Sequence, residues 1–180
     1  AVIAANHVSF VDALVLAAAS PRPIRFLMDH RIFATPVLGA LFRLAGAIPV
    51  APQKEDPVVY QRAFEAASKV LADGDLLGIF PEGGITRDGR LQPFRGGIAR
   101  IIERDPVPVV PVALLDLWGS SFSRIDGGRA LARPLRRGLF SRIGVEVAAP
   151  MPARGLTPEA LQHQVQQPPD IPSLSRTSTP

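Results

Sequence analysis

The chain has 180 residues, of which 47% are apolar and 20% charged, and it carries a formal net charge of +4. This length and composition indicate that most of the chain folds, as one domain with a substantial core. The absence of cysteine excludes disulfides, thiolate catalysis and cysteine-ligated zinc, and no uncharged run approaches the roughly 20 residues of a membrane-spanning helix.

The basic surplus lies in the second half of the chain. Residues 87–180 hold 13 basic and 8 acidic side chains, whereas residues 1–86 hold 7 and 8. Such a surplus suits a phosphate-bearing substrate, an anionic lipid surface or an acidic carrier protein. No DNA- or RNA-binding signature is present, so we expect no nucleic-acid partner. The chain begins with Ala rather than Met and opens inside an apolar run, from which we expect a piece of a longer polypeptide. No signal-peptide pattern is present.

The first element is the apolar run 1–5, a predicted strand that delivers His7 to its C-terminal end. Ser9 is predicted to be the N-cap of a helix over 13–19, which places Asp12 at the third helical position. From there its carboxylate could accept a hydrogen bond from one imidazole nitrogen and leave the other as a general base. A Ser-x-x-Asp pattern is also an ordinary capping box, and a histidine at a strand end is often structural, so this stretch alone leaves catalysis open.

The rest of the chain alternates predicted strands with predicted helices. The strands are expected at 24–28, 46–50 (an edge strand or loop, because it contains Pro49), 76–80, 107–115 and 143–148, and the helices at 36–45, 58–72, 97–104 and 157–166. This alternation predicts an α/β fold: a central mixed, largely parallel β-sheet covered by helices, in a single domain. We assign residues 1–150 to the domain and 151–180 to a Pro/Ser/Gln-rich tail or linker with at most one short helix.

The predicted helix over 36–45 carries apolar residues around much of its circumference. It is therefore either deeply buried or pressed with one side into lipid headgroups. Core packing is the commoner outcome for such a helix, so contact with a membrane is the second interpretation.

The strand over 76–80 runs into a glycine-rich turn, 81–89. Ligands of α/β folds bind where strands end, and glycines let backbone N–H groups approach a phosphate or an oxyanion. Arg87 could add a bidentate phosphate contact. The alternative is an ordinary surface turn, because the turn has no phosphate-loop or dinucleotide fingerprint. We predict that His7 and this turn face each other across one cleft.

Four blocks in sequence order resemble those of the phospholipid/glycerol acyltransferase family, the 1-acylglycerol-3-phosphate acyltransferases. They are Asn6-His7-x-Ser9-x-x-Asp12, Gly46-Ala47-Ile48-Pro49-Val50, Phe80-Pro81-Glu82-Gly83 and Val109-Val110-Pro111-Val112-Ala113. The resemblance spans roughly residues 1–150. It implies the glycerolipid acyltransferase fold and transfer of a fatty acyl group from acyl-CoA or acyl-carrier protein to a lysolipid hydroxyl, with 1-acylglycerol-3-phosphate as the expected acceptor in phospholipid biosynthesis.

The resemblance also implies roles for individual residues. His7 removes the hydroxyl proton, Asp12 orients the imidazole, and the alkoxide attacks the thioester directly, with backbone N–H groups near Ser9 holding the oxyanion. The headgroup would be bound by Glu82, Gly83, Gly84, Thr86 and Arg87, with Asn6, Ser9, Pro81 and Pro111 in support. No cofactor and no metal are implied. The expected partners are the lysolipid, the acyl donor and the cytoplasmic side of a membrane, where this piece would lie peripherally and the full-length chain could be integral.

The chain also departs from the family pattern. Its second block lacks the arginine that many members carry, and Thr86-Arg87 follows Glu82 two positions later than the family's Thr-Arg pair. In this it is similar to acyltransferase domains fused to transporter or acyl-activating modules, so reacylation of 2-acylglycerophosphoethanolamine stays an alternative.

Two functions of other classes also stay open. A serine hydrolase using Ser9 is disfavoured, because no Gly-x-Ser-x-Gly elbow is present. A non-catalytic membrane-docking module would rest on the arginine cluster 129–137 and the apolar residues of 33–44.

Overall fold

The computed structural model describes residues 1–9, 11–117 and 143–167. Its centre is one six-stranded sheet. The strands are β1 (Val2–Ala5), β2 (Ile24–Asp29), β3 (Ile48–Val50), β4 (Leu76–Ile79), β5 (Val109–Leu115) and β6 (Gly144–Val147). Their spatial order is β3-β2-β4-β1-β5-β6, and every neighbouring pair is parallel except β5 with β6. The predicted mixed, largely parallel sheet of an α/β fold is confirmed.

Five α-helices and one 3-10 helix join the strands within the described residues. They are α1 (Asp12–Ala19), η1 (His30–Ala34), α2 (Pro36–Leu44), α3 (Pro57–Ala72), α4 (Gly97–Arg104) and α5 (Pro158–Gln166). The clearest start signal is that of α3, where the Asp56 side chain accepts hydrogen bonds from the N–H groups of Val58 and Val59 and proline occupies the first helical position. Helices α3, α4 and α5 all begin and end within about a residue of their predicted limits.

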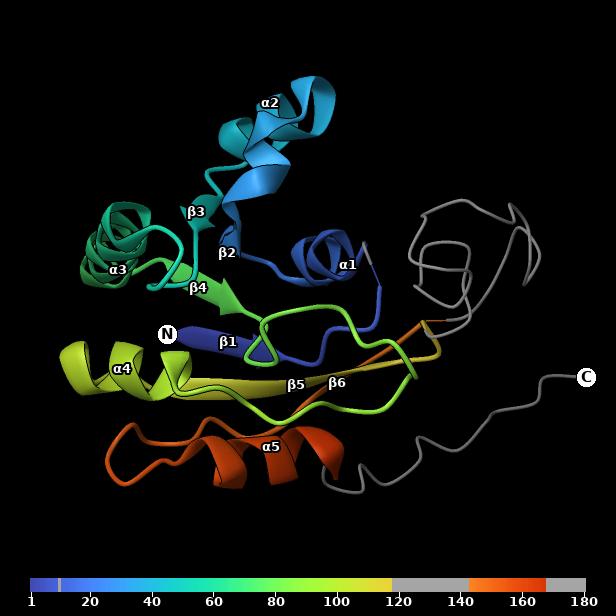
Figure 1. The fold of residues 1–180 in the computed structure, drawn as a ribbon. Helices are drawn as coiled ribbons and strands as arrows, with labels where there is room; N and C mark the ends of the chain where they lie inside the picture. Colours follow the sequence, from blue (N-terminus) through green and yellow to red (C-terminus); the bar gives the residue numbers. More distant parts are fainter. Residues whose placement is uncertain (10, 118–142, 168–180) are drawn as a thin grey trace, which may run out of the picture.

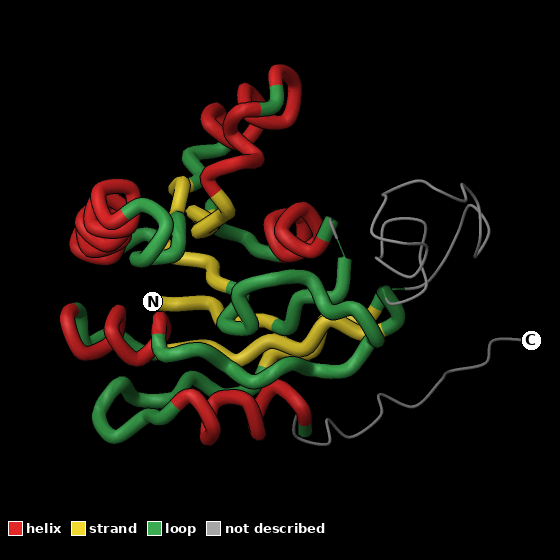
Figure 2. The backbone as a smooth tube through the Cα atoms, in the orientation of Figure 1, coloured by secondary structure: helices red, strands yellow, loops and turns green. Residues whose placement is uncertain are grey.

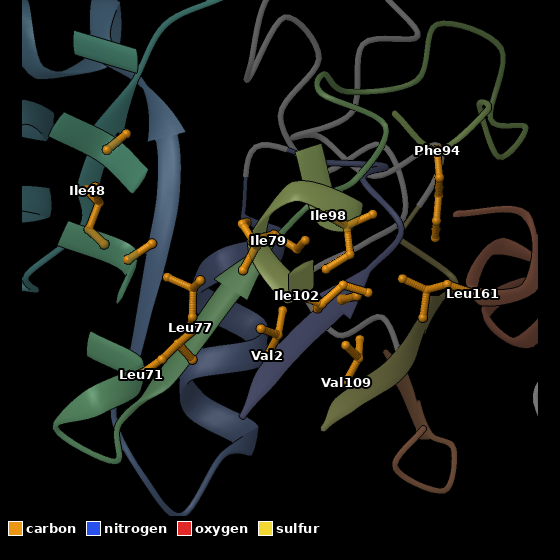
Figure 3. Close-up of a cluster of buried hydrophobic side chains, with 14 of the residues drawn as sticks. Val2, Ile48, Leu71, Leu77, Ile79, Phe94, Ile98, Ile102, Val109 and Leu161 are labelled. Atoms are coloured by element: carbon orange, nitrogen blue, oxygen red, sulfur yellow. The ribbon is translucent and has the colours of Figure 1, made fainter. Parts of the chain in front are cut away.

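Helices cover both faces of the sheet (Figure 1). On one face, residues of α3, α4 and α5 pack against Val2, Leu77 and Val109 in the larger apolar cluster, which Figure 3 shows. On the other face, Leu16 of α1 packs with Phe26 in a smaller cluster. Because successive strand residues point to opposite faces, the continuous apolar strands serve both clusters at once.

The segment after residue 150 belongs to the domain as far as residue 167. Met151 exchanges two backbone hydrogen bonds with Val109 of β5, and Leu161 and Val165 of α5 are buried in the larger cluster. The boundary that we placed at 150 is thus too early, because a short amphipathic helix behind a Pro-rich stretch supplies one wall of the core. Residues 168–180, predicted as a tail, lie outside the described residues, as does the arginine cluster 129–137.

Helix α2 is not part of the core. Figure 1 shows it standing away from the sheet, beyond β2 and β3. Its one buried residue is Gly39, whose Cα packs against the backbone of Phe33 in η1, while Val37, Leu38, Leu41 and Leu44 are exposed. Core packing, the commoner outcome expected for this helix, is therefore not observed. Within the described part of the chain, the helices are all too short or too polar to cross a bilayer.

Candidate active site

The polar groups of the site gather where β1 and β4 end. These strands are parallel neighbours, so the loops that follow them emerge at the same edge of the sheet (Figure 2). The N–H of His7 donates to Glu82 Oε1 at 2.6 Å, and the carbonyl of His7 accepts from the N–H of Thr86 at 2.9 Å. The structure therefore brings His7 and the glycine-rich turn together, as the sequence predicts.

His7 and Asp12 form a hydrogen-bonded pair. Nδ1 of His7 lies 2.8 Å from Oδ2 of Asp12, and the same oxygen accepts from the N–H groups of Val8 and Ser9 at 2.7 and 2.9 Å. Asp12 is fully buried, whereas the His7 side chain is 20% exposed. Three donors hold the carboxylate in place, and it in turn fixes the imidazole with Nε2 left for a substrate.

The start of α1 differs from the prediction. The helix begins at Asp12 rather than at Ala13, its N-cap position is Val11, and no side chain caps it. Ser9 is therefore not the N-cap; it is buried, and its hydroxyl accepts only a long 3.4 Å bond from the N–H of Val11. Asp12 is able to reach back because it is the first helical residue, next to the loop that it binds.

This arrangement also corrects the expected oxyanion donors. The N–H groups of Val8 and Ser9 already donate to Asp12, and that of His7 donates to Glu82. They are not available to a tetrahedral intermediate. The Ser9 hydroxyl makes no hydrogen bond with His7, which removes the geometric basis for a Ser9 nucleophile.

The imidazole of His7 rests on an aromatic stack that was not among the predicted site residues. Its ring lies on Phe80, with centroids 4.1 Å apart and planes 15° from parallel, and Phe80 stacks on Phe26 at 5.8 Å. Gly78 makes this possible, because a Cβ there would collide with the Phe26 ring. The sequence signal was the glycine two residues before Phe80 in an otherwise apolar strand.

Glu82 is buried, and both of its oxygens are occupied. Oε1 accepts from the N–H of His7, and Oε2 accepts from the N–H of Gln92 at 2.7 Å. Burial raises the pKa of this carboxyl, and the two N–H donors partly oppose the rise. The structure thus differs from the expected headgroup contact: Glu82 ties the His7 loop to the turn after β4.

The other predicted headgroup residues divide into two groups. Thr86 is buried, with Oγ1 2.8 Å from the carbonyl oxygen of Arg90 and 2.9 Å from Asp88, so its hydroxyl holds the loop together. Gly83 has a φ of +70°, which favours glycine. Gly83, Gly84 and Arg87 are exposed, and they are the members of the predicted set that a ligand can reach.

The four supporting residues fix the ends of the strands. The Asn6 amide exchanges two hydrogen bonds with the backbone of Leu114, at 3.0 and 2.7 Å, which joins the end of β1 to β5. The carbonyl of Pro81 accepts from the N–H of Arg95. Pro111 is fully buried and lies opposite Ala4. With Ser9 bound to Asp12, all four have structural contacts.

The arrangement holds an imidazole that is oriented by a buried carboxylate and partly open to solvent, which are the properties that a general base requires. Such a base can take a proton from a hydroxyl and return it to a leaving group. Within residues 1–9, 11–117 and 143–167, no group of three or more acidic or histidine side chains is placed to hold a metal ion.

Comparison with known proteins decides the family. The acyltransferase family model matches residues 1–115, which include both the His7–Asp12 pair and the glycine-rich turn. The chain belongs to the acyltransferase family. The resemblance found in the four sequence blocks is confirmed.

Several curated acyltransferases are similar to the chain. A chloroplastic 1-acyl-sn-glycerol-3-phosphate acyltransferase of Brassica napus is 32% identical over 114 residues, which cover 63% of this chain and 32% of the relative. A lyso-ornithine lipid O-acyltransferase of Pseudomonas aeruginosa is 30% identical over 171 residues, covering 91% of this chain and 64% of the relative. The chain thus spans about a third of the length of the Brassica acyltransferase.

A solved acyltransferase structure has the same fold. The crystal structure of the 1-acyl-sn-glycerophosphate acyltransferase PlsC from Thermotoga maritima superposes with a TM-score of 0.66 at 22% identity, over 92% of this chain and 61% of that one. At this identity the match establishes the fold, and the chemistry has to be argued from the residues of the site.

Proposed function

We propose that the protein transfers a fatty acyl group from acyl-CoA or acyl-carrier protein to the free hydroxyl of a lysolipid, with 1-acylglycerol-3-phosphate as the acceptor. The observation that carries the proposal is the His7–Asp12 pair, with Nδ1 bound to the buried carboxylate at 2.8 Å. Family membership and the names of the relatives support the same reaction class.

The reaction follows from the geometry of this pair. The acceptor hydroxyl donates to Nε2 of His7, which takes the proton as the oxygen attacks the thioester carbonyl. Asp12 stabilises the imidazolium that forms. When the tetrahedral intermediate collapses, the C–S bond breaks and the imidazolium returns the proton to the departing thiolate. No acyl-enzyme is needed, and the Ser9 hydroxyl is not hydrogen-bonded to His7, as an activated serine nucleophile would be.

The test is product identification. The purified protein is incubated with radiolabelled acyl-CoA or acyl-carrier protein and a panel of three lysolipids: 1-acylglycerol-3-phosphate, 2-acylglycerophosphoethanolamine and lyso-ornithine lipid. We expect the label in a diacyl product and its loss in His7→Ala. Release of free fatty acid from a lysolipid without a donor would instead indicate a hydrolase.

A second acceptor has its own support. The Pseudomonas relative, named a lyso-ornithine lipid O-acyltransferase, matches 91% of this chain, more than the plant relatives do. The second block, 48–52, also lacks the arginine that many family members carry. In the panel above, a preference for lyso-ornithine lipid or for 2-acylglycerophosphoethanolamine would replace 1-acylglycerol-3-phosphate as the acceptor.

We further propose that α2 docks this domain peripherally on the cytoplasmic side of an anionic membrane. Its outward side chains are strongly exposed, with Val37 at 79% and Leu44 at 86%. No acidic residue occurs between Asp29 and Glu55, whereas Arg43 and Lys54 do, so the charge complements anionic lipid. A lysolipid acceptor lies in such a membrane, which makes this surface consistent with the proposed reaction.

A further inference from the structure

Arg95 is a cation at the active site that the sequence motifs do not single out. A Cβ placed on Gly83 would lie 2.9 Å from Nε of Arg95 and 3.0 Å from Cζ, so the guanidinium group lies directly on the glycine that follows Glu82. Glu82 in turn holds the N–H of His7. Arg95 is thus connected to the general base through a single carboxylate and its neighbouring glycine.

The guanidinium group of Arg95 has no hydrogen bond or ion pair with another described residue, and its side chain is exposed. Glu82, the carboxylate next to Gly83, does not pair with it, because both oxygens of Glu82 accept backbone N–H groups. The N–H donors of Arg95 therefore remain available to a ligand. A planar guanidinium favours the oxygens of a phosphate or carboxylate, which it can bind in a bidentate manner.

The surface around Arg95 leaves room for such a ligand. A Cβ added to Gly84, Gly96 or Gly97 would meet no heavy atom within 4 Å. Gly96 and Gly97 follow Arg95 in the chain and Gly84 follows the glycine on which the guanidinium lies, and their missing side chains let a headgroup approach the backbone here. The fold itself is held by the backbone of Arg95, whose N–H donates to the carbonyl of Pro81.

We propose that Arg95 binds the phosphate of the lysolipid acceptor and so takes the part that the sequence assigns to Thr86 and Arg87. This assignment rests on the proposed acyl transfer. Thr86 uses its hydroxyl within the loop, and the exposed Arg87 side chain has no hydrogen bond or ion pair with a described residue and, unlike Arg95, is not seen against the glycine after Glu82. The acyl donor also carries phosphate groups, so the test separates binding of the acceptor from binding of the donor.

The experiment compares Arg95→Ala with Arg87→Ala and with Arg104→Ala, an exposed arginine in the last turn of α4. We expect Arg95→Ala to raise the KM for 1-acylglycerol-3-phosphate about 10- to 100-fold, the loss expected for a charge-assisted hydrogen-bond pair. Its kcat and its KM for acyl-CoA should stay within about twofold of wild type. Arg104→Ala should behave as wild type. Arg95→Lys should lose less affinity than Arg95→Ala, because lysine keeps the positive charge but not the paired N–H donors of the guanidinium.

A phosphate-free acceptor, 1-acylglycerol, provides the second arm. Its kcat/KM should be the same in wild type and Arg95→Ala, so that the variant loses only the preference for phosphate. An unchanged KM for 1-acylglycerol-3-phosphate, an effect confined to the acyl-CoA KM, or the large loss appearing in Arg87→Ala instead would each overturn the assignment. If the wild type transfers an acyl group to no lysolipid, the proposed function fails as well; an active wild type with an unaffected Arg95→Ala refutes this assignment alone.

Discussion

The loop around His7 and helix α2 differ in which side chains they bury: the loop buries charged side chains, and α2 exposes apolar ones. In the loop, Asp12 and Glu82 are buried, and the N–H groups of His7, Val8 and Ser9 each have a carboxylate partner. On α2, large apolar side chains are exposed. The loop is held by internal hydrogen bonds, as the proposed general base requires, whereas α2 presents the apolar surface that we propose docks on a membrane. We therefore expect substitutions in the loop to change turnover and substitutions on α2 to change membrane binding.

The largest effect is expected from the general base. His7→Ala should lower kcat by about 10²- to 10⁴-fold, the usual contribution of general acid–base catalysis. Asp12→Asn keeps an oxygen for the N–H groups of Val8 and Ser9 but removes the negative charge beside the imidazole, and it should lower kcat by at least about 10²-fold. Both are measured as initial rates of acyl transfer. Vesicle binding of these variants should equal that of the wild type; a parallel loss of binding would show that the two regions are not separable.

The next effect is expected from Glu82. In Glu82→Gln, one oxygen keeps a backbone donor, but the new amide N–H₂ faces the other backbone N–H, so one buried donor loses its partner. The His7 loop should shift, and kcat should fall about tenfold. The acceptor KM should stay within about twofold of wild type, since Glu82 does not contact the headgroup. A raised KM with an unchanged kcat would instead support the headgroup contact expected from the family resemblance.

Substitutions on α2 test the other region. Val37→Ser combined with Leu44→Ser removes two exposed apolar side chains, each worth about 1.5–3 kcal/mol when fully buried. Partial burial among headgroups should still lower the affinity for anionic vesicles about tenfold or more. Val58→Ser is the matched control, because Val58 is also exposed but lies on α3. Sedimentation with vesicles measures the change, and unaltered binding of the double variant would exclude α2 as the docking surface.

The smallest expected effect is on stability as a function of pH. Burial raises the pKa of Glu82 above its ordinary value of 4.5, so the folded state holds this proton more tightly than the unfolded chain. Protonated Glu82 therefore stabilises the fold fully at pH values below 4.5. This stabilisation decreases as the pH rises from 4.5 through the raised pKa, and at still higher pH the free energy of unfolding no longer changes because of Glu82. Urea unfolding at a series of pH values should show this decline in wild type but not in Glu82→Gln. An identical pH profile in both proteins would contradict it.

Local patterns were enough to predict that the His7 and Asp12 side chains form a hydrogen-bonded pair. His7 and Asp12 are separated by one short loop, so the reach of a carboxylate at a helix start decides the contact, and the error in the N-cap did not matter. The meeting of His7 with the turn after β4 followed from the rule that parallel strands end at one edge of the sheet. The predicted limits of α3, α4 and α5 were close because capping residues, prolines and glycines mark them.

The remaining features depend on contacts that a sequence pattern does not encode. The burial of Glu82 between two backbone N–H groups requires the position of Gln92, ten residues later in an irregular loop. An apolar helix looks the same whether it packs in a core or stands outside it, so the exposure of α2 could not be read from its periodicity. Arg95 lies 12 residues beyond Gly83, the last residue of the Phe80–Gly83 block, and its position against Gly83 depends on the path of the loop between them.

The bonds of Glu82 have a consequence for biosynthesis. They join Glu82 to His7, which lies 75 residues earlier in the chain, and to Gln92, which lies 10 residues later. A nascent polypeptide that has emerged from the ribosome as far as α3 already contains His7 and Asp12, but it lacks β4 and the loop that anchors them. The complete set of hydrogen bonds around His7 can therefore form only after Gln92 has been translated and β4 has paired with β1, so this loop becomes ordered late, together with the tertiary structure.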